Sequence, residues 1–286
     1  MGRATRLIVG TPLLDHTVRL PAPPALIVVD VDGTLLTSDH EVTAVTAVQV
    51  RRVRASGVEV LAASSRGPRA MLPVLRALGL PAEFVGSQGA FTGSYDAAGV
   101  LHPTVRIPAP MDAACAVVAA ATRAGLAVSW FAADRWLVSH VDATIAREAR
   151  VVHDAPEAAD LLAPGDGPDK LMIIARTPDD LPVLRGLARD LPAGLTAQIS
   201  NPTYLEITRQ GVDKASAVRE YCAKRGIAAE RVVAIGDGPN DLGLLAFAGT
   251  GIAPANARAE VAAAATWMTR SNDDDGVAWA LSVLVP

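Results

Sequence analysis

Two aspartates follow directly after a short apolar segment near the start of the chain. Leu26–Val29 is apolar and mostly β-branched, and Asp30 and Asp32 come next, before the turn residues Gly33-Thr34. Such a segment is typical of a buried strand in a parallel sheet. Because side chains alternate along a strand, both carboxylates are expected on the same side of its end. Carboxylates so close repel one another unless a cation lies between them, so the pair indicates a metal site; the alternative is a helix cap beside a solvated neighbour.

A second acidic loop follows another apolar segment, Val232–Ile235. Asp237 and Asp241 flank Gly238-Pro239-Asn240 in this loop. The carboxyl ends of parallel strands meet at one edge of a sheet, so we expect this loop to join the first pair there. Four carboxylates supply the hard oxygen ligands that Mg²⁺ prefers. Turn residues with a helix N-cap are the alternative interpretation.

Two further polar residues could bind an anion beside these acids. Ser64 follows the expected strand 58–62, where its hydroxyl and the neighbouring amides could hold a phosphate oxygen at a helix N-terminus. Lys214 is the first residue of an expected helix. A positive charge is unfavourable at the N-terminus of a helix, so a lysine at this position suggests a functional role. A helix cap and a solvated surface lysine are the alternatives. An anion held beside Mg²⁺ and a carboxylate nucleophile indicates phosphoryl transfer.

Strands and helices alternate on both sides of these motifs, which predicts an α/β fold with a doubly wound parallel sheet and right-handed crossovers. The pattern changes near Phe91 to short strands, hairpins and helices, and the first pattern returns from Lys214 onward. A smaller α+β module is therefore expected to be inserted into the sheet domain. The predicted organisation is an N-terminal extension at 1–24, a catalytic core at 25–90 and 209–286, and an inserted cap at 91–208.

Composition narrows the classes of function. The chain has 286 residues, of which 50% are hydrophobic, and its net charge is −4, which argues against a nucleic-acid surface. No apolar segment reaches the length of about 18 residues that a membrane span needs. Residues 1–24 lack the pattern of a signal peptide. Cys115 and Cys222 lie in apolar, helix-like contexts and predict neither a disulfide framework nor a zinc site, so we expect a cytoplasmic protein.

Four motifs in this order resemble those of haloacid dehalogenase-like (HAD) phosphohydrolases: DVDGTLL, ASSR, GVDK and GDGPND. The inserted module is similar to the α/β cap of the Cof subfamily, and the resemblance implies a Rossmann-like core. The resemblance extends from Ala25 to the C-terminus and includes the segments 251–257 and 271–277. It implies a Mg²⁺-dependent phosphatase that hydrolyses small phosphorylated metabolites, such as sugar phosphates, through an aspartyl-phosphate intermediate.

The resemblance also implies roles for individual residues. Asp30 would attack phosphorus, and Asp32 would protonate the leaving alcohol, activate water and give Mg²⁺ its backbone carbonyl. Ser64 would bind the transferring phosphoryl group, and Lys214 would neutralise the nucleophile and the phosphate. The implied metal set is Asp30, Asp32, Asp237 and Asp241. The implied substrate contacts are Ser65, Arg66, Gln88, Gly89, Lys170 and Asn240.

Two motifs depart from the family pattern. Ser64-Ser65-Arg66 stands where the family often has Thr-Gly-Arg, and Gln88-Gly89-Ala90 stands where it often has Asn-Gly-Ala. Serine keeps the hydroxyl of threonine, so the departures concern substrate contacts rather than phosphoryl chemistry.

The cap is expected to bind the leaving group and so to determine substrate specificity. Candidate residues in or near its strands are Trp130, Arg135, Trp136, His140 and Lys170. Packing in the cap core is the alternative for the tryptophans, a turn charge for the arginine, and a surface position for the histidine.

Other functions remain open from the sequence. A phosphomutase would return the phosphoryl group to a second hydroxyl, and a catalytically silent protein would only bind sugar phosphates. A receiver-type signalling module also gathers acids and a lysine at a sheet edge, but it is about half as long and has no inserted cap. The physiological substrate and the oligomeric state are left open.

Overall fold

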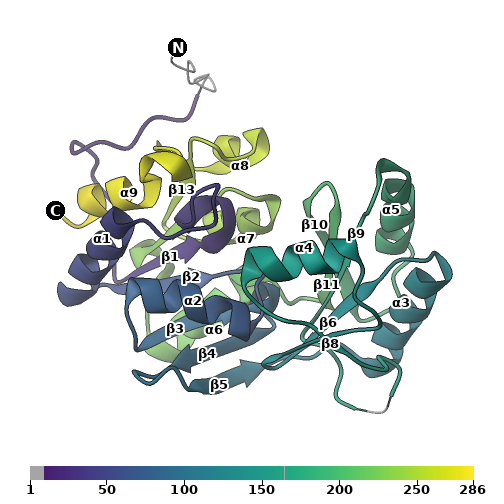
Figure 1. Ribbon diagram of the computed structural model, residues 1–286. Helices are drawn as coiled ribbons and strands as arrows, with labels where there is room; N and C mark the ends of the chain where they lie inside the picture. The colour runs from purple at the N-terminus through teal and green to yellow at the C-terminus, as the bar shows by residue number, and fades with distance from the viewer. Residues whose placement is uncertain (1–9, 164) are drawn as a thin grey trace. The chain divides into compact units, whose positions relative to one another are not determined.

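A computed structural model describes residues 10–163 and 165–286 (Figure 1). The chain divides into two compact units. The first unit comprises Met1–Ala63, Val74–Ala82 and Val218–Pro286, and the second comprises Ser64–Pro73 and Glu83–Ala217. This division passes through helices and strands, so the predicted domain boundaries at 90/91 and 208/209 stay a prediction.

The first unit is built on a parallel sheet in which neighbouring strands follow the order β14-β13-β12-β1-β2. Its strands are β1 (Leu26–Asp30), β2 (Glu59–Ala63), β12 (Val232–Ile235), β13 (Thr250–Pro254) and β14 (Trp267–Thr269). All residues of β1 and β12 are buried, as expected of central strands in a parallel sheet. The predicted α/β fold with a parallel sheet is thus confirmed.

Helices pack against this sheet and against one another. They are α1 (Ala44–Ala55), α7 (Leu242–Phe247), α8 (Ala259–Ala264) and α9 (Gly276–Leu284). Thr43 caps α1 by accepting a hydrogen bond from the Thr46 amide, and α1 packs against α9. Three further elements cross the division between the units: α2 (Pro68–Leu78), β3 (Ala82–Gly86) and α6 (Lys214–Arg225).

Part of the predicted N-terminal extension is ordered against the edge strand β14. Residues 1–9 of this extension lie outside the described residues. The Leu14 amide donates to Met268 O at 2.7 Å, and the Met268 amide donates to Pro12 O at 2.8 Å. Leu14 is only 2% exposed, and Trp279 Nε1 donates to its carbonyl at 3.1 Å. The segment therefore covers backbone groups that an edge strand would otherwise leave to solvent.

The second unit contains a six-stranded sheet of order β10-β11-β9-β6-β7-β8, antiparallel except between its last two strands. Its strands are β6 (Val128–Ala132), β7 (Arg135–Val138), β8 (Glu157–Ala158), β9 (Lys170–Ile174), β10 (Leu195–Asn201) and β11 (Tyr204–Arg209). Three helices join it: α3 (Met111–Arg123), α4 (Ala143–Val152) and α5 (Leu181–Arg189). A hairpin of β4 (Phe91–Tyr95) and β5 (Leu101–Arg106) belongs to the same unit. The predicted mixture of hairpins and helices is confirmed.

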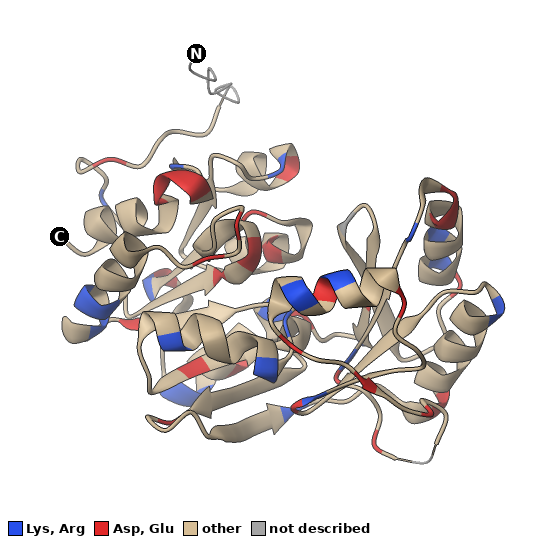
Figure 2. Cartoon of the chain, in the orientation of Figure 1, with Lys and Arg blue, Asp and Glu red and all other residues tan. Residues whose placement is uncertain are grey.

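Side chains alternate between two apolar clusters along the strands of this sheet. Trp130 and Leu171 pack with residues of α3 and α5, whereas Phe131 and Trp136 pack with Ile145 of α4. Acidic and basic residues are distributed over the elements of both units (Figure 2). Among the described residues, none of the helices combines the length and the apolar character that crossing a bilayer requires.

Candidate active site

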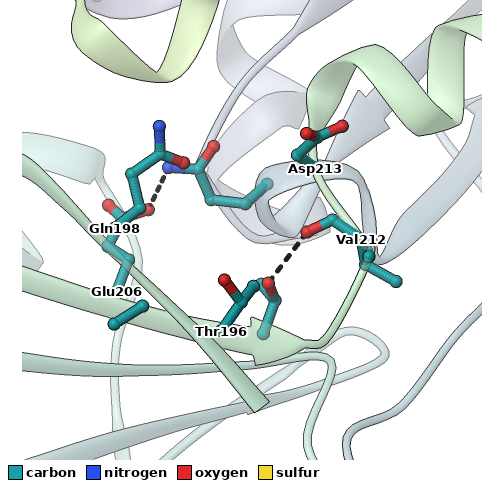
Figure 3. A pocket seen from close by; sticks show the side chains of 9 residues that line it. Thr196, Gln198, Glu206, Val212 and Asp213 are labelled. Carbon is teal, nitrogen blue, oxygen red and sulfur yellow. Dashed lines mark hydrogen bonds between the residues drawn. The ribbon is translucent and has the colours of Figure 1, made fainter. Parts of the chain in front are cut away.

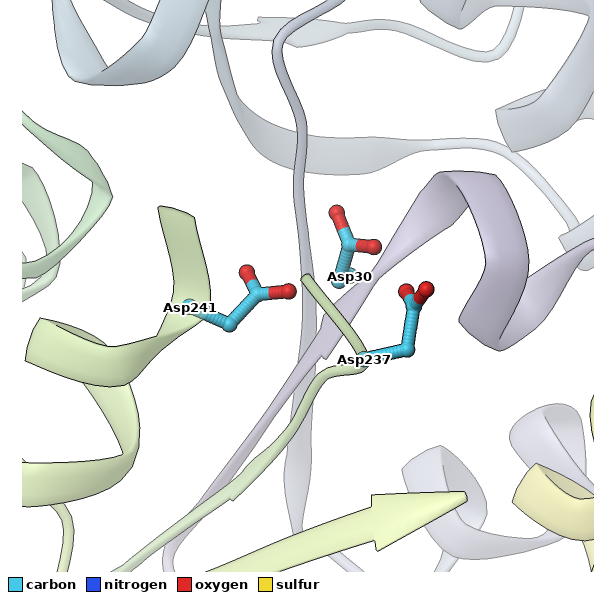
Figure 4. Close-up of side chains that lie close together, drawn as sticks. All are labelled: Asp30, Asp237 and Asp241. Carbon is cyan, nitrogen blue, oxygen red and sulfur yellow. The ribbon is translucent and has the colours of Figure 1, made fainter. Parts of the chain in front are cut away.

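Three aspartates of the first unit converge at one edge of its parallel sheet. Asp30, Asp237 and Asp241 each offer a carboxylate oxygen, and these oxygens lie within 4.8 Å of one another (Figure 4). Asp30 is 5% exposed and Asp241 is fully buried. Buried like charges at this spacing repel one another strongly, and a cation among them would relieve the repulsion. The donor set, consisting only of carboxylate oxygens, fits Mg²⁺.

The pairing of β1 with β12 brings these aspartates together. The strands run parallel in a register that aligns Val29 with Ile235, so both chains leave the sheet at the same edge. Asp30 is the last residue of β1, and Asp237 follows β12 after a single glycine. Asp241 ends a 3₁₀ turn, in which its Oδ2 accepts a hydrogen bond from the Gly238 amide at 3.1 Å.

Two glycines leave the space that the carboxylates fill. A Cβ atom on Gly33 would lie 2.5 Å from Asp237 Oδ2, and one on Gly236 would lie 2.5 Å from Asp241 Cγ. Gly33 also has a φ of +80°, which L residues rarely adopt. The glycines of both acidic motifs are therefore required by close packing around the aspartates.

Asp32 lies apart from this cluster. The strand ends at Asp30, and Asp32 occupies the following turn, Val31–Leu35, with a side chain that is 41% exposed. Its Oδ1 is 3.8 Å from His40 Nδ1. The spacing predicted both carboxylates on the same side of the strand's end, but the chain turns after Asp30, so the two side chains have different surroundings. The metal and acid–base roles of Asp32 stay predictions.

Hydrogen bonds from one threonine and two asparagines hold the loops of the cluster. Thr34 Oγ1 donates to Asp237 Oδ1 at 2.8 Å, and Asn256 Nδ2 donates to Gly33 O at 2.7 Å. The backbone N–H of Asn272 in turn donates to Asn256 Oδ1 at 3.0 Å. These contacts explain why the segments 251–257 and 271–277 belong to the sequence pattern, although Asn256 and Asn272 were not among the predicted site residues.

Asp273 secures the loop that follows β1. It accepts hydrogen bonds from the Ser38 amide at 2.7 Å and from Ser38 Oγ at 2.8 Å. These hydrogen bonds lower the pKa of the Asp273 carboxyl below its usual value. Asp275 similarly accepts a hydrogen bond from Thr43 Oγ1 at 2.6 Å, which fixes the start of α1.

The predicted anion-binding residues lie in the second unit. Ser64 is 1% exposed, and its Oγ accepts a hydrogen bond from the Arg66 amide at 3.0 Å. The backbone N–H of Gln88 donates to Ser64 O at 3.1 Å, and the backbone N–H of Ser87 donates to Arg66 O at 2.8 Å. The segment 64–66 is thus tied directly to the segment 87–88.

The backbone at Asp213, which precedes Lys214, lies close to the backbone at Gly89, next to the segment 87–88. A Cβ atom on Gly89 would lie only 2.1 Å from Asp213 O, and the φ of Gly89 is +99°. Lys214 follows as the first residue of α6 and is fully buried. The Asp213 carboxylate accepts a hydrogen bond from the Ser216 amide at 2.7 Å and so caps the helix.

Lys170 belongs to a buried polar network centred on Glu206, a residue that the sequence analysis missed. Lys170 Nζ donates to Ser65 O at 2.7 Å and lies 3.7 Å from Glu206 Oε1. Gln88 Nε2 donates to Glu206 Oε2, and Ser200 Oγ donates to Glu206 Oε1 at 3.2 Å. Lys170 and Glu206 are 2% and 3% exposed, respectively. The network brings together Ser65, Gln88 and Lys170, which were predicted as substrate contacts.

The other predicted cap residues do not gather around Glu206. Trp130 and Trp136 are buried in the two apolar clusters. Arg135 pairs with Glu157 at 2.8 Å, and His140 is exposed. These positions correspond to the alternative interpretations of core packing, a paired surface charge and a surface histidine.

Comparisons with known proteins agree with this architecture. The sequence profile of the haloacid dehalogenase-like hydrolase family matches residues 27–281. Pyridoxal phosphate phosphatase YbhA of Escherichia coli (strain K12) is 26% identical over 88% of this chain and 96% of its own length. The 5-amino-6-(5-phospho-D-ribitylamino)uracil phosphatase YitU of Bacillus subtilis (strain 168) is 27% identical over 89% of this chain and 95% of its own.

A crystal structure of a haloacid dehalogenase-like hydrolase from Bacteroides thetaiotaomicron superposes with a TM-score of 0.79 at 26% identity. The match covers 91% of this chain and 98% of that protein. The similarity therefore includes both units of the chain.

Proposed function

Because the chain belongs to the haloacid dehalogenase-like hydrolases and is a phosphatase of that family, we propose that it is Mg²⁺-dependent and hydrolyses small phosphorylated metabolites through an aspartyl-phosphate on Asp30. The observation that carries this proposal is the convergence of Asp30, Asp237 and Asp241, two of them buried, at the sheet edge. The two named relatives act on different phosphomonoesters, so the substrate itself does not follow from them. The cysteine usage supports our further proposal that the protein works in the cytoplasm.

The reaction would proceed in two displacements. A carboxylate oxygen of Asp30 attacks phosphorus, the bond from phosphorus to the substrate oxygen breaks, and Asp32 gives its proton to that oxygen. Asp32, now ionised, then takes a proton from water as the water attacks the phosphorus of the aspartyl-phosphate. Inorganic phosphate leaves, and Asp30 regains its carboxylate. The partly exposed position of Asp32 suits a group that exchanges protons with substrate and water.

Mg²⁺ would be held by Asp30, Asp237 and Asp241, with Asp32 contributing its backbone carbonyl. Bound there, the ion would offset the negative charge of the carboxylates and of the phosphoryl group. Asn240, in the turn that ends at Asp241, is proposed to act next to this site.

Ser64 and Lys214 would hold the phosphoryl group, with Ser65, Arg66 and Gly89 shaping its surroundings. Backbone hydrogen bonds fix the segments 64–66 and 87–88 against one another, and Lys214, which is fully buried, would supply a positive charge. Such prearranged donors contribute to phosphoryl transfer mainly through positioning and charge neutralisation.

Phosphate release from a panel of phosphomonoesters tests this function. We expect release that requires Mg²⁺, stops with EDTA, and falls by at least about a thousandfold in Asp30→Asn, because the nucleophile is lost. Asp39→Asn is the matched control, since Asp39 is an exposed aspartate in the loop after the same strand. Isomer formation without phosphate release would indicate a phosphomutase, and binding without turnover would indicate a silent binding protein.

A further inference from the structure

We propose that Arg69 is a positioning residue for the phosphoryl group. Its ion pairs with Asp154 and Glu157 form what we call the Arg69 clamp, which holds the start of α2 and, through it, the segment 64–66. The proposal rests on the phosphatase function proposed above. It assigns a role in the reaction to a residue outside the sequence motifs.

Arg69 occupies a position at which a positive charge is unfavourable. It is the second residue of α2, where a cation opposes the helix dipole. The sequence of the first turn, Pro68-Arg69-Ala70-Met71, contains no acid that would offset this charge. Asp154 and Glu157 supply the negative charge from a distant part of the sequence, so the start of α2 and the segment 154–157 depend on one another.

The guanidinium of Arg69 contacts several groups of this segment. Its Nε donates to Asp154 Oδ1 at 2.8 Å, its Nη1 donates to Glu157 Oε1 at 3.3 Å, and its Nη2 donates to Ala155 O. The side chain of Asp154 is only 7% exposed, so loss of the arginine would leave a largely buried charge without this cation. A planar guanidinium can serve all these acceptors at once, whereas a lysine ammonium lacks the fixed fork.

Glu157 connects the clamp to the sheet of the second unit. It belongs to β8, which pairs with β7, and Arg135 of β7 donates to Glu157 Oε2 at 2.8 Å while Arg69 binds the other oxygen. The hydrogen bond from Arg135 lowers the pKa of the Glu157 carboxyl, which is therefore ionised at neutral pH. Charges of alternating sign thus extend from α2 to β7.

A second anchor holds the other end of the same loop. Lys170 Nζ donates to Ser65 O at 2.7 Å and pairs with Glu206. Glu206 also lines a cavity of about 300 Å³ together with Gln198, so this anchor is not closely packed on every side (Figure 3). The Arg69 clamp supplies the restraint at the end of the loop that enters α2.

Few residues separate the clamp from the hydroxyl proposed to bind phosphate. Arg69 follows Ser64 by five positions. Between them, Tyr95 Oη donates to Pro68 O at 2.9 Å and so restrains the connecting backbone. A displacement at Arg69 is therefore transmitted to Ser64 Oγ and to the Arg66 N–H that donates to it. Small misplacements of such groups slow phosphoryl transfer strongly, because the reaction depends on positioning.

Arg69→Gln tests the clamp by removing its charge while keeping a polar side chain. Hydrolysis is measured with para-nitrophenyl phosphate and with the best alkyl phosphate of the panel described above, and inorganic phosphate is measured as an inhibitor. We expect kcat/KM to fall by about tenfold, by the same factor for both esters, because the clamp acts on the phosphoryl group rather than on the alcohol. The inhibition constant of phosphate should rise by about threefold or more for the same reason.

Arg76→Gln is the matched control, because Arg76 is an exposed arginine in the last turn of the same helix. It should leave both quantities unchanged. Kinetics are measured well below the thermal midpoint of each variant, so that unfolding does not contribute to the rates.

Asp154→Asn breaks the same ion pair from the other side. Combined with Arg69→Gln it should cause little further loss, because the pair is already broken. Arg69→Lys keeps the charge without the fork and is expected to recover part of the activity. If Arg69→Gln does not fold, Asp154→Asn and Arg69→Lys carry the same kinetic expectation.

Unchanged kcat/KM and unchanged phosphate inhibition in folded Arg69→Gln would overturn the proposal. A loss confined to one ester would also overturn it, since the effect would then lie on the alcohol, as would an equal loss in Arg76→Gln. If the wild-type protein hydrolyses neither ester under any condition, the phosphatase function is wrong. Calorimetric titration with inorganic phosphate and Mg²⁺ then decides on the clamp alone: weaker binding to Arg69→Gln than to wild type supports it, and equal binding, or no binding to wild type, overturns it.

Discussion

The aspartates at the sheet edge are held in place by what surrounds them. Asp237 accepts a hydrogen bond from Thr34, and Asp241 accepts one from the Gly238 amide, so each carboxylate has a fixed orientation. Fixed carboxylates bind a small cation with little further ordering, which is what a site for Mg²⁺ requires.

Asp241→Asn should weaken Mg²⁺ binding more than it weakens substrate binding. The variant keeps the size of the side chain but removes one buried negative charge. We expect the Mg²⁺ concentration for half-maximal activity to rise by more than about tenfold, with a small change in KM. Titration of activity with Mg²⁺ at saturating substrate measures this, and an unchanged Mg²⁺ requirement would exclude Asp241 as a ligand.

Gly236→Ala tests the packing around the same aspartate. The new Cβ atom would lie 2.5 Å from Asp241 Cγ, so the loop must shift, at a cost of about 1–3 kcal/mol in the free energy of unfolding and with loss of Mg²⁺ affinity. Gly186→Ala in α5 is the control, since its Cβ atom would meet nothing within 4 Å and alanine favours a helix. Chemical denaturation measures the free energy of unfolding of both variants. Equal stabilities of the two variants would contradict the crowding seen at Gly236.

The loops of the first unit depend on residues far away in the sequence. Ser38 and Thr43 lie after β1, yet their partners Asp273 and Asp275 lie near the C-terminus. The C-terminal segment therefore positions the loop that carries His40, whose ring lies near Asp32.

Asp273→Asn should destabilise the protein at neutral pH but not in acid. The folded-state pKa of Asp273 is lowered by hydrogen bonds from Ser38, so its contribution is present above the unfolded pKa of about 3.9 and is lost as the pH falls through the lowered value. The difference in unfolding free energy between wild type and variant should thus shrink below about pH 4. Because the side chain is exposed, the effect should be small; a difference independent of pH would contradict this account.

Elements with a clear pattern could be predicted from the sequence, and those formed by distant pairing could not. The strand Val232–Ile235 was predicted with the bounds observed, because the apolar segment ends at a glycine-containing turn. The start of the helix Lys214–Arg225 was also predicted correctly. Helix α9 was missed since it is apolar on nearly every side and shows no amphipathic period. Hairpin β4–β5 was missed although the non-polar residues Phe91, Gly93 and Tyr95 alternate with Thr92 and Ser94, a signal that could have been used.

The same distinction applies to the candidate site. The three clustered aspartates were predicted because each follows a recognisable strand. Glu206 was missed because its partner Gln88 lies 118 positions away, and a single acid within a strand carries no local signal. His40 was missed for a similar reason, since only the turn after β1 brings it near Asp32.

For the molecule as a whole, the ordered part of the N-terminal extension protects a sheet edge. Pro12 and Leu14 pair with Met268 of β14, and Leu14 is buried, with its carbonyl accepting a hydrogen bond from Trp279 Nε1. An uncovered edge strand offers unpaired backbone groups to other chains.

Deletion of residues 1–20 should therefore lower the thermal midpoint and promote self-association while leaving the acidic cluster intact. Scanning calorimetry and light scattering measure the two effects, and phosphate release checks that the site is preserved. Leu13→Ser is a suitable control, because Leu13 is 54% exposed and its side chain contributes little burial. A truncated protein that is as stable and as dispersed as the full chain would show that this covering segment has no structural role.

The proposed phosphatase mechanism depends on Asp30 acting as a nucleophile. Rapid acid quench during turnover, followed by mass spectrometry of the digested protein, tests this most directly. We predict a phosphoryl group on the peptide that contains Asp30 when Mg²⁺ is present, and none in EDTA or in Asp30→Asn. Active turnover with no phosphorylated peptide, or with the phosphoryl group on another residue, would contradict the proposed mechanism.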